Sequence, residues 1–322
     1  MWINSTKMFF IMTMMSSITM SISSNSMIMI WMMIEISNMS FVPIMMTKKM
    51  NNSESIMKFF LVQSTSSMIM LFSLMMMLLK NNNYELIMML SLIMKMGGVP
   101  FHNWVIAMIK GMEYNSMMML LTVMKIPTMT LLSMLSIKMN LIIILSMLVP
   151  TMLMVNENSM KKMMSLSSMF NLGLMLSLSM NINMWMTYIM IYSIMMKMMM
   201  KQLKMNKIKQ MNQLMVNSKT IKKTEIWISM MSLGGLPPLM GFINKLMTIN
   251  MMLKMKELMM IMILVLSSTT ILYVYMKYMF SCMMFYLSMN KTKMKVFFNK
   301  TSTFLPLNIL VAPMMISMKL FN

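Results

Sequence analysis

The sequence predicts an all-α membrane protein with about eleven transmembrane helices. Of its 322 residues, 58% are hydrophobic and only 11% are charged, and the mean hydropathy is +0.70. Apolar runs of roughly 20 residues, the length that crosses a bilayer as a helix, recur along the whole chain. Clustered glycine and proline interrupt two of these runs, which predicts two broken helices.

The apolar runs give the predicted spans in chain order. They are Met8–Ile22, Met27–Met46, Ile56–Leu79, Glu85–Ile109, Ser116–Ile137, Met139–Val155, Met163–Met180, Ile182–Met200, Glu225–Leu253, Leu258–Phe280 and Thr303–Leu320. We expect them to form one polytopic transmembrane domain over residues 1–322, in which the fourth and ninth spans are broken.

The lysines indicate how the chain is oriented. All 28 basic residues are lysine, and the formal charge is +21. On a soluble protein this charge would favour a nucleic-acid partner, but these lysines lie mainly between the spans, so none is expected. Most fall on the side of the N-terminus and of the loop Lys197–Thr224, which the positive-inside rule places on the inner side. A specific anionic ligand for this loop is the alternative.

The positions of the two broken spans predict an internal repeat. They lie five spans apart, and a repeat unit with an odd number of spans has inverted topology, as in many secondary transporters. We therefore expect inverted repeats over residues 8–137 and 139–280, followed by a C-terminal helix over 303–320.

The first broken span contains the sequence LIMKMGGVPFHNW, residues Leu92–Trp104. Here Lys95 precedes Gly97-Gly98 and Pro100. Backbone polar groups at membrane depth need partners, so such a break survives only inside protein or beside a wet cavity. A charge at that depth costs roughly 2.5 kcal/mol or more, and is usually paired and functional. The alternative is an interhelical loop whose lysine extends to the membrane surface.

The second broken span contains SLGGLPPLMGFINK, in which three glycines and two prolines precede Lys245. A helix end inside the bilayer directs its dipole at any charge on a transport path. The sequence therefore predicts a second functional lysine at this break.

Two further ionisable residues lie within predicted spans. Glu35 is near the middle of the second span, and Lys125 lies two residues before Pro127 in the fifth. A lysine away from water can hold and release a proton, and the proline frees a backbone carbonyl that can line a hydrated cavity. For Glu35 the alternative is a polar contact between helices.

Three more candidates lie near the ends of spans or breaks. Glu54 and Lys58 are four residues apart, the spacing of an ion pair on one helix face. The single histidine, His102, can relay protons or cap the broken helix by hydrogen bonding.

Several kinds of cofactor site are not expected in this chain. One cysteine, Cys282, and one histidine cannot make a disulfide framework, a Cys-ligated iron–sulfur cluster or a Cys/His zinc site. There is also no G-x-G-x-x-G motif for a dinucleotide. We expect no metal, flavin or NADH site here.

Four motifs carry a resemblance to a known family: SLGGLPPLMGFINK, KMGGVPFHNW, ESIMKFFLVQS and SLSSMFNLG. Over nearly its whole length the chain is similar to chain 2 of mitochondrial NADH:ubiquinone oxidoreductase (respiratory complex I), one of the antiporter-like membrane subunits. One departure follows the first break, where Ile106-Ala107 replaces the family's usual Pro-Glu.

The resemblance implies a row of charged residues along the membrane midplane that conducts protons. In it Glu35 pairs with Lys95 on the first broken helix, Lys125 is the connecting lysine, and Lys245 belongs to the second broken helix. The chain would then be a subunit of an H⁺-translocating NADH:ubiquinone reductase, with the flavin, iron–sulfur clusters and ubiquinone in partner subunits.

The resemblance also implies partners and a location. The partners would be other complex I subunits, above all neighbouring antiporter-like ones, and membrane lipids such as cardiolipin. The location would be the mitochondrial inner membrane, with the N-terminus on the matrix side. A stand-alone cation/proton antiporter is the alternative function, and a purely structural subunit is a third.

Overall fold

The computed structural model describes residues 5–46, 50–79, 84–135, 139–211, 213 and 220–289, and its regular elements there are all α-helices. The helices are α1 Ser5–Ser23, α2 Met27–Met45, α3 Met50–Leu78, α4 Glu85–Met96, α5 Asn103–Ile109, α6 Tyr114–Leu121, α7 Lys125–Ser133, α8 Asn140–Met154, α9 Met160–Ser177, α10 Ile182–Asn206, α12 Thr220–Gly234, α13 Met240–Lys254 and α14 Leu258–Met289. The predicted all-α class is thus confirmed. The predicted span Thr303–Leu320 lies outside the described residues.

Four stretches of the described chain are long and apolar enough to cross a membrane as they stand. They are Met27–Met45, Asn52–Leu78, Tyr114–Ser133 and Leu258–Ser281, and the shorter helix α8 is also apolar. The helices on either side of the two predicted breaks, α4 and α5, and α12 and α13, are each shorter than 18 residues. The count of eleven spans therefore depends on joining such pairs and stays a prediction.

The chain folds into two compact units. The first contains the described residues up to Ser146 together with Asn171–Met186, and the second contains Met147–Phe170 and those from Thr187 onward. The predicted repeats 8–137 and 139–280 were inferred from the order of the spans alone, and they also stay a prediction.

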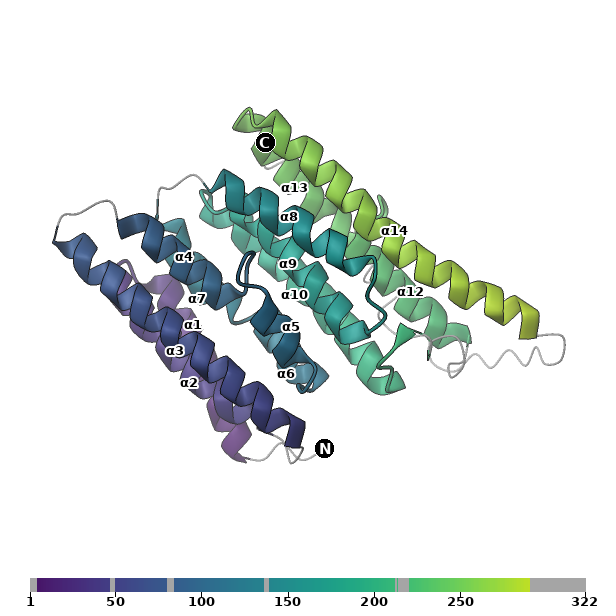
Figure 1. The fold of residues 1–322 in the computed structure, drawn as a ribbon, viewed down its shortest axis with the longest axis horizontal. Coiled ribbons are helices and arrows are strands. Elements are labelled where there is room, and N and C mark those ends of the chain that lie inside the picture. Colours follow the sequence, from purple (N-terminus) through teal and green to yellow (C-terminus); the bar gives the residue numbers. More distant parts are fainter. Residues whose placement is uncertain are drawn as a thin grey trace. The chain divides into compact units, whose positions relative to one another are not determined.

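The first unit is built on α1, α2 and α3, with α1 and α3 both in contact with α2 (Figure 1). Helices α4 and α5 pack on α3, and α7 packs on α1, α2 and α4. Phe41 of α2 and Phe59 of α3 are fully buried, with their rings edge to face at 5.4 Å. This ring contact packs α2 against α3.

In the second unit α12, α13 and α14 contact one another. Its core includes three fully buried tyrosines, Tyr188, Tyr192 and Tyr275.

The long helices of both units have apolar outer surfaces. Met68 of α3 is 71% exposed, and Met262 of α14 is 63% exposed. Exposed apolar surface of this kind suits contact with lipid or with another membrane subunit.

The far half of α14 is tied to the segment between α8 and α9. The Tyr278 hydroxyl lies 2.9 Å from the Glu157 carbonyl oxygen and 3.0 Å from Asn158 Oδ1. Glu157 also accepts two hydrogen bonds from Lys162, at 2.7 and 2.9 Å. This small polar cluster holds the segment against α14.

Tyr278→Phe should loosen that segment without unfolding the unit. Loss of one hydrogen bond is worth about 1 kcal/mol, which corresponds to about fivefold faster amide exchange in residues 155–160. Hydrogen–deuterium exchange followed by mass spectrometry measures this. Tyr273→Phe is the control, because Tyr273 lies on the same helix and is 59% exposed. Equal amide exchange in both variants would show that the Tyr278 hydroxyl does not hold residues 155–160 against α14.

Candidate functional site

The end of α4 is shaped by glycine. Gly97 has φ +70° and Gly98 N–H donates to the Ile93 carbonyl at 2.9 Å, so the chain turns sharply off the helix. A Cβ on Gly97 would lie 2.1 Å from Val105 Cγ2, at the start of the next helix. Only glycine therefore allows α4 to end here with α5 packed against it.

Side chains from neighbouring helices satisfy the last carbonyls of α4. Trp104 Nε1 of α5 donates to the Met94 carbonyl at 3.1 Å, and Gln63 Nε2 of α3 donates to the Lys95 carbonyl at 3.0 Å. A helix end in an apolar environment needs such partners, because water is not there to supply them. The end of α4 is therefore ordered by hydrogen bonds from neighbouring helices and is not frayed.

The same end of α4 carries an ion pair. Lys95 Nζ lies 2.6 Å from Glu35 Oε1 of α2, and the two side chains are 1% and 24% exposed. Lys95 also lies in the last turn of α4, where the helix dipole favours a cation. The structure therefore brings together the two residues whose pairing the family resemblance implied.

A third interruption, which the sequence analysis did not predict, lies between α6 and α7. We predicted a span over Ser116–Ile137 and no break in it; the stretch Tyr114–Ser133 is long and apolar enough to cross a membrane, but its helix is interrupted at residues 122–124. Pro127 is the reason: it has no N–H to offer the carbonyl of Val123, and its ring clashes with that carbonyl in an α-helix. The Val123 carbonyl instead accepts from Ile126 N–H at 3.2 Å. Lys125 consequently becomes the first residue of α7.

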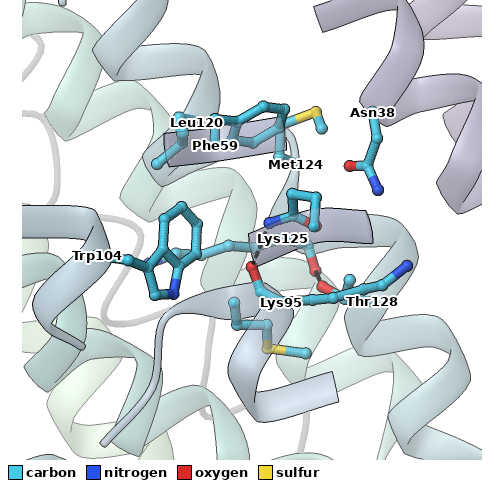
Figure 2. A pocket seen from close by; sticks show the side chains of 10 residues that line it. Asn38, Phe59, Lys95, Trp104, Leu120, Met124, Lys125 and Thr128 are labelled. Carbon is cyan, nitrogen blue, oxygen red and sulfur yellow. Dashed lines mark hydrogen bonds between the residues drawn. The ribbon is translucent and has the colours of Figure 1, made fainter. Parts of the chain in front are cut away.

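Lys125 and Lys95 border one small cavity in the first unit. The space open to the centre of a water molecule is about 20 Å³. Both lysines are buried, at 3% and 4% exposure. Figure 2 shows side chains from several helices gathered around this cavity. Its lining is Asn38, Phe59, Gln63, Lys95, Met96, Trp104, Leu120, Met124, Lys125 and Thr128.

The second break, in the other unit, holds Lys245. Lys245 Nζ of α13 donates to the carbonyl of Gly234, the last residue of α12. Gly235 follows with φ +76°, and a Cβ there would lie 2.7 Å from Lys245 Cε. The glycine therefore makes the room through which this lysine reaches the end of α12. An ammonium at that carboxyl end is electrostatically favoured.

The remaining sequence candidates lie elsewhere. Glu54 and Lys58 form an ion pair on α3 with both side chains substantially exposed, so it contributes little to stability. His102 precedes α5 and makes no side-chain cap on that helix. Its Nδ1 lies 3.1 Å from the Pro100 carbonyl oxygen. These three residues do not join the buried lysines of the first unit.

The sequence analysis missed the neutral polar residues of the site. Gln63 and Trp104 cap α4, and Asn38 and Thr128 line the cavity. A signal for two of them was present, because Asn38 and Gln63 are single amides within apolar runs. Among the described residues no three His, Cys, Asp or Glu side chains gather as a metal site would require.

Comparison with known proteins places this arrangement in a family. Residues 24–272 match the family model described as NADH:quinone oxidoreductase/Mrp antiporter, transmembrane. The chain is 34% identical over 301 residues to NADH-ubiquinone oxidoreductase chain 2 of Anopheles gambiae, covering 87% of this chain and 86% of that one. It is 30% identical over 331 residues to the same protein of Locusta migratoria, covering 98% and 96%.

Two solved structures share the fold. A chain of respiratory complex I from Thermus thermophilus with bound aureothin superposes with a TM-score of 0.77 at 15% identity, covering 86% of this chain and 70% of that one. A chain of the Mrp complex from Dietzia sp. gives a TM-score of 0.70 at 13% identity, covering 84% and 59%.

Gly241→Ala should destabilise the second break severely. A Cβ on Gly241 would lie 1.7 Å from the Ser232 carbonyl oxygen, a backbone atom that cannot move alone. We expect a cost at or above the upper end of overpacking, about 3 kcal/mol, seen as a lower melting temperature and less assembled protein on a native gel. Gly234→Ala is the matched control, because its Cβ would lie 3.3 Å from a Tyr275 ring carbon. Identical behaviour of the two variants would refute this account of the break.

Proposed function

Because the chain belongs to the NADH-ubiquinone oxidoreductase chain 2 family, we propose that it is a proton-conducting membrane subunit of NADH:ubiquinone oxidoreductase. The observation that carries the proposal is the site of the first unit. Lys95, which is paired with Glu35, and Lys125 are both buried and border one water-sized cavity. Ionisable groups placed so far from water are costly and mark ion or proton paths.

In the proposed mechanism the ion pair controls the charge on its neighbour. Lys95 and Lys125 border one cavity, and charges there interact more strongly than in water because the effective dielectric constant is about 20 instead of about 80. When quinone reduction elsewhere rearranges charge, the Glu35–Lys95 pair opens or closes. The field at Lys125 changes with it, which drives Lys125 to take up or release a proton.

The helix ends make the lysines unequal. Lys95 lies in the last turn of α4, and Lys245 bonds the last carbonyl of α12, so both occupy helix ends that favour a positive charge. Lys125 is the first residue of α7, at an end that disfavours one. Helix ends contribute about 0.3–1 kcal/mol to such preferences. We therefore propose that Lys125 releases its proton more readily than the other two lysines, and that Lys245 is the next proton carrier on the path.

The proposal includes the membrane topology. We take α4 with α5, and α12 with α13, each as one broken span, and α6 with α7 as a third interrupted span. With the predicted span over 303–320 this gives eleven spans in two inverted repeats. Support comes from the helix ends at the breaks, which meet their hydrogen-bonding needs inside the protein.

We further propose the surroundings of the chain. It would lie in the mitochondrial inner membrane with its N-terminus on the matrix side, among other complex I subunits, antiporter-like ones in particular, with cardiolipin among its lipids. The names of its chain 2 relatives support the first part, and the lysine distribution supports the orientation. Flavin, iron–sulfur clusters and ubiquinone would be held by the partner subunits.

A native gel of mildly solubilised membranes tests this assignment against a stand-alone cation/proton antiporter. The chain should migrate in one very large band that oxidises NADH. Migration as a small species without that activity would overturn the assignment and leave the antiporter, whose fold the Mrp chain shares.

Lys125→Met should sharply reduce or abolish proton pumping while leaving the complex assembled. Methionine keeps much of the side chain's apolar volume but cannot carry a proton. Protons moved per NADH oxidised, in membrane vesicles, is the measurement. Lys254→Met is the control, because Lys254 is exposed at the end of α13. A full proton count in the assembled Lys125→Met complex would show that Lys125 is not on the path.

A further inference from the structure

We propose that one end of the second unit binds the phosphate headgroup of an anionic phospholipid. The inference rests on the proposed function for its membrane topology, and it adds a lipid site that the proton path does not use. The site is a set of five lysines from the start of α9, the segment after α10 and the far half of α14, which we call the basic cluster: Lys161, Lys162, Lys207, Lys209 and Lys277.

Two backbone hydrogen bonds bring four of these lysines together. The Met160 N–H donates to the Lys209 carbonyl at 3.1 Å, and the Met211 N–H donates to the Asn158 carbonyl, also at 3.1 Å. The short segment that leads into α9 is thereby paired with the segment that follows α10. The two lysines at the start of α9 and the two that follow α10 therefore lie on adjoining segments.

The fifth lysine reaches the cluster from α14. Lys277 Nζ lies 6.0 Å from the centre of the Tyr278 ring, and the hydroxyl of that ring lies 2.9 Å from the Glu157 carbonyl oxygen. The Glu157 carboxylate in turn accepts hydrogen bonds from Lys162 at 2.7 and 2.9 Å. A series of contacts thus joins α14 to the segment before α9 and connects Lys277 to the other lysines.

The basic cluster has more positive charge than the chain neutralises. Glu157 is the carboxylate that pairs with Lys162. Lys207, Lys209 and Lys277 are exposed and form no ion pair within the described residues, which include all seven acidic side chains of the chain. Any specific counter-charge for these three lysines therefore comes from outside the chain, and an anion is the ligand that this surface fits.

An apolar stripe on α14 leads to the basic cluster. Four exposed apolar or aromatic side chains recur at the spacing of one helix face: Met262, Leu266, Tyr273 and Phe280. Lys277 lies on the same face, between the last two of them and near the end of the apolar stretch of this helix. A lysine at that depth can extend its ammonium group to the membrane surface while its stem stays in contact with apolar groups.

A phospholipid matches both parts of this surface. Its phosphate can accept hydrogen bonds from several ammonium groups, and its acyl chains can lie along the stripe on α14. Under the proposed topology the basic cluster is on the inner side of the membrane, where basic pockets between helices bind anionic head groups. Positive-inside charge alone requires no fixed arrangement of lysines, whereas backbone hydrogen bonds hold the segments together here.

Photo-crosslinking in the assembled complex tests the proposal. The complex is placed in phosphatidylcholine bilayers that contain a small fraction of phosphatidylglycerol, and either the neutral or the anionic lipid carries a photoreactive group in its acyl chain. Each lysine beside an anionic lipid contributes about a fivefold preference. Phosphatidylglycerol should therefore label α14 between Tyr273 and Phe280 about tenfold or more above phosphatidylcholine, molecule for molecule. Mass spectrometry of the labelled peptides measures this ratio.

A pair of double variants tests whether the lysines cause the preference. Lys207→Gln combined with Lys277→Gln should reduce the labelling ratio about tenfold or more. Lys254→Gln combined with Lys256→Gln should leave it unchanged. This is the matched control, because it removes two exposed lysines beside the start of α14. Lys256 also shares the positive φ of Lys207, at 59° and 52°.

The outcomes separate this proposal from the proposed function. Equal labelling by the two lipids in the unmodified complex overturns the lipid site, and so does a ratio that Lys207→Gln with Lys277→Gln leaves unchanged. No labelling by either lipid also overturns it, because a protein partner then covers this face of α14. If the double variant does not assemble, the comparison of the two lipids in the unmodified complex decides. The native gel and the proton count of Lys125→Met test the proposed function without involving these lysines.

Discussion

The central interaction of the first unit is an ion pair whose lysine, Lys95, is buried and whose carboxylate, Glu35, is partly buried. Removing the partner of a buried charge is strongly destabilising, up to about 3–5 kcal/mol for a fully buried pair. Lys95 and Glu35 come from α4 and α2, so the pair requires α4 to end where it does and α2 to pack beside it. The glycines after α4, the caps from Gln63 and Trp104, and the small cavity all lie at this same helix end.

In the second unit a different kind of residue caps the broken helix end. There the lysine itself caps the broken end, since Lys245 Nζ donates to the Gly234 carbonyl. In the first unit neutral side chains cap α4, which leaves the Lys95 ammonium to its carboxylate. One helix end therefore bears a lysine whose partner can change charge, and the other bears a lysine held by a backbone dipole. The two broken helix ends therefore hold their lysines by different interactions.

Much of the fold was predictable because it follows from composition. Apolar runs gave the all-α class, and glycine with proline marked the sites where α4 and α12 end. The interruption before Lys125 was missed, although Pro127 was noticed, because sequence does not show whether a proline kinks a helix or stops it. Asn38 and Thr128 were missed for another reason. Their importance lies in the cavity that α2 and α7 share, which no local pattern encodes.

The most direct test of the central claim replaces the whole pair. Glu35→Gln combined with Lys95→Met removes both charges together, and a pair replaced in this way is often tolerated because no lone charge is left buried. The measurement is protons moved per NADH in vesicles that contain the assembled complex. We predict that the double variant assembles and oxidises NADH with an artificial acceptor, but moves fewer protons than the unmodified complex. A full proton count would mean that the pair only holds helices together, and it would contradict the account.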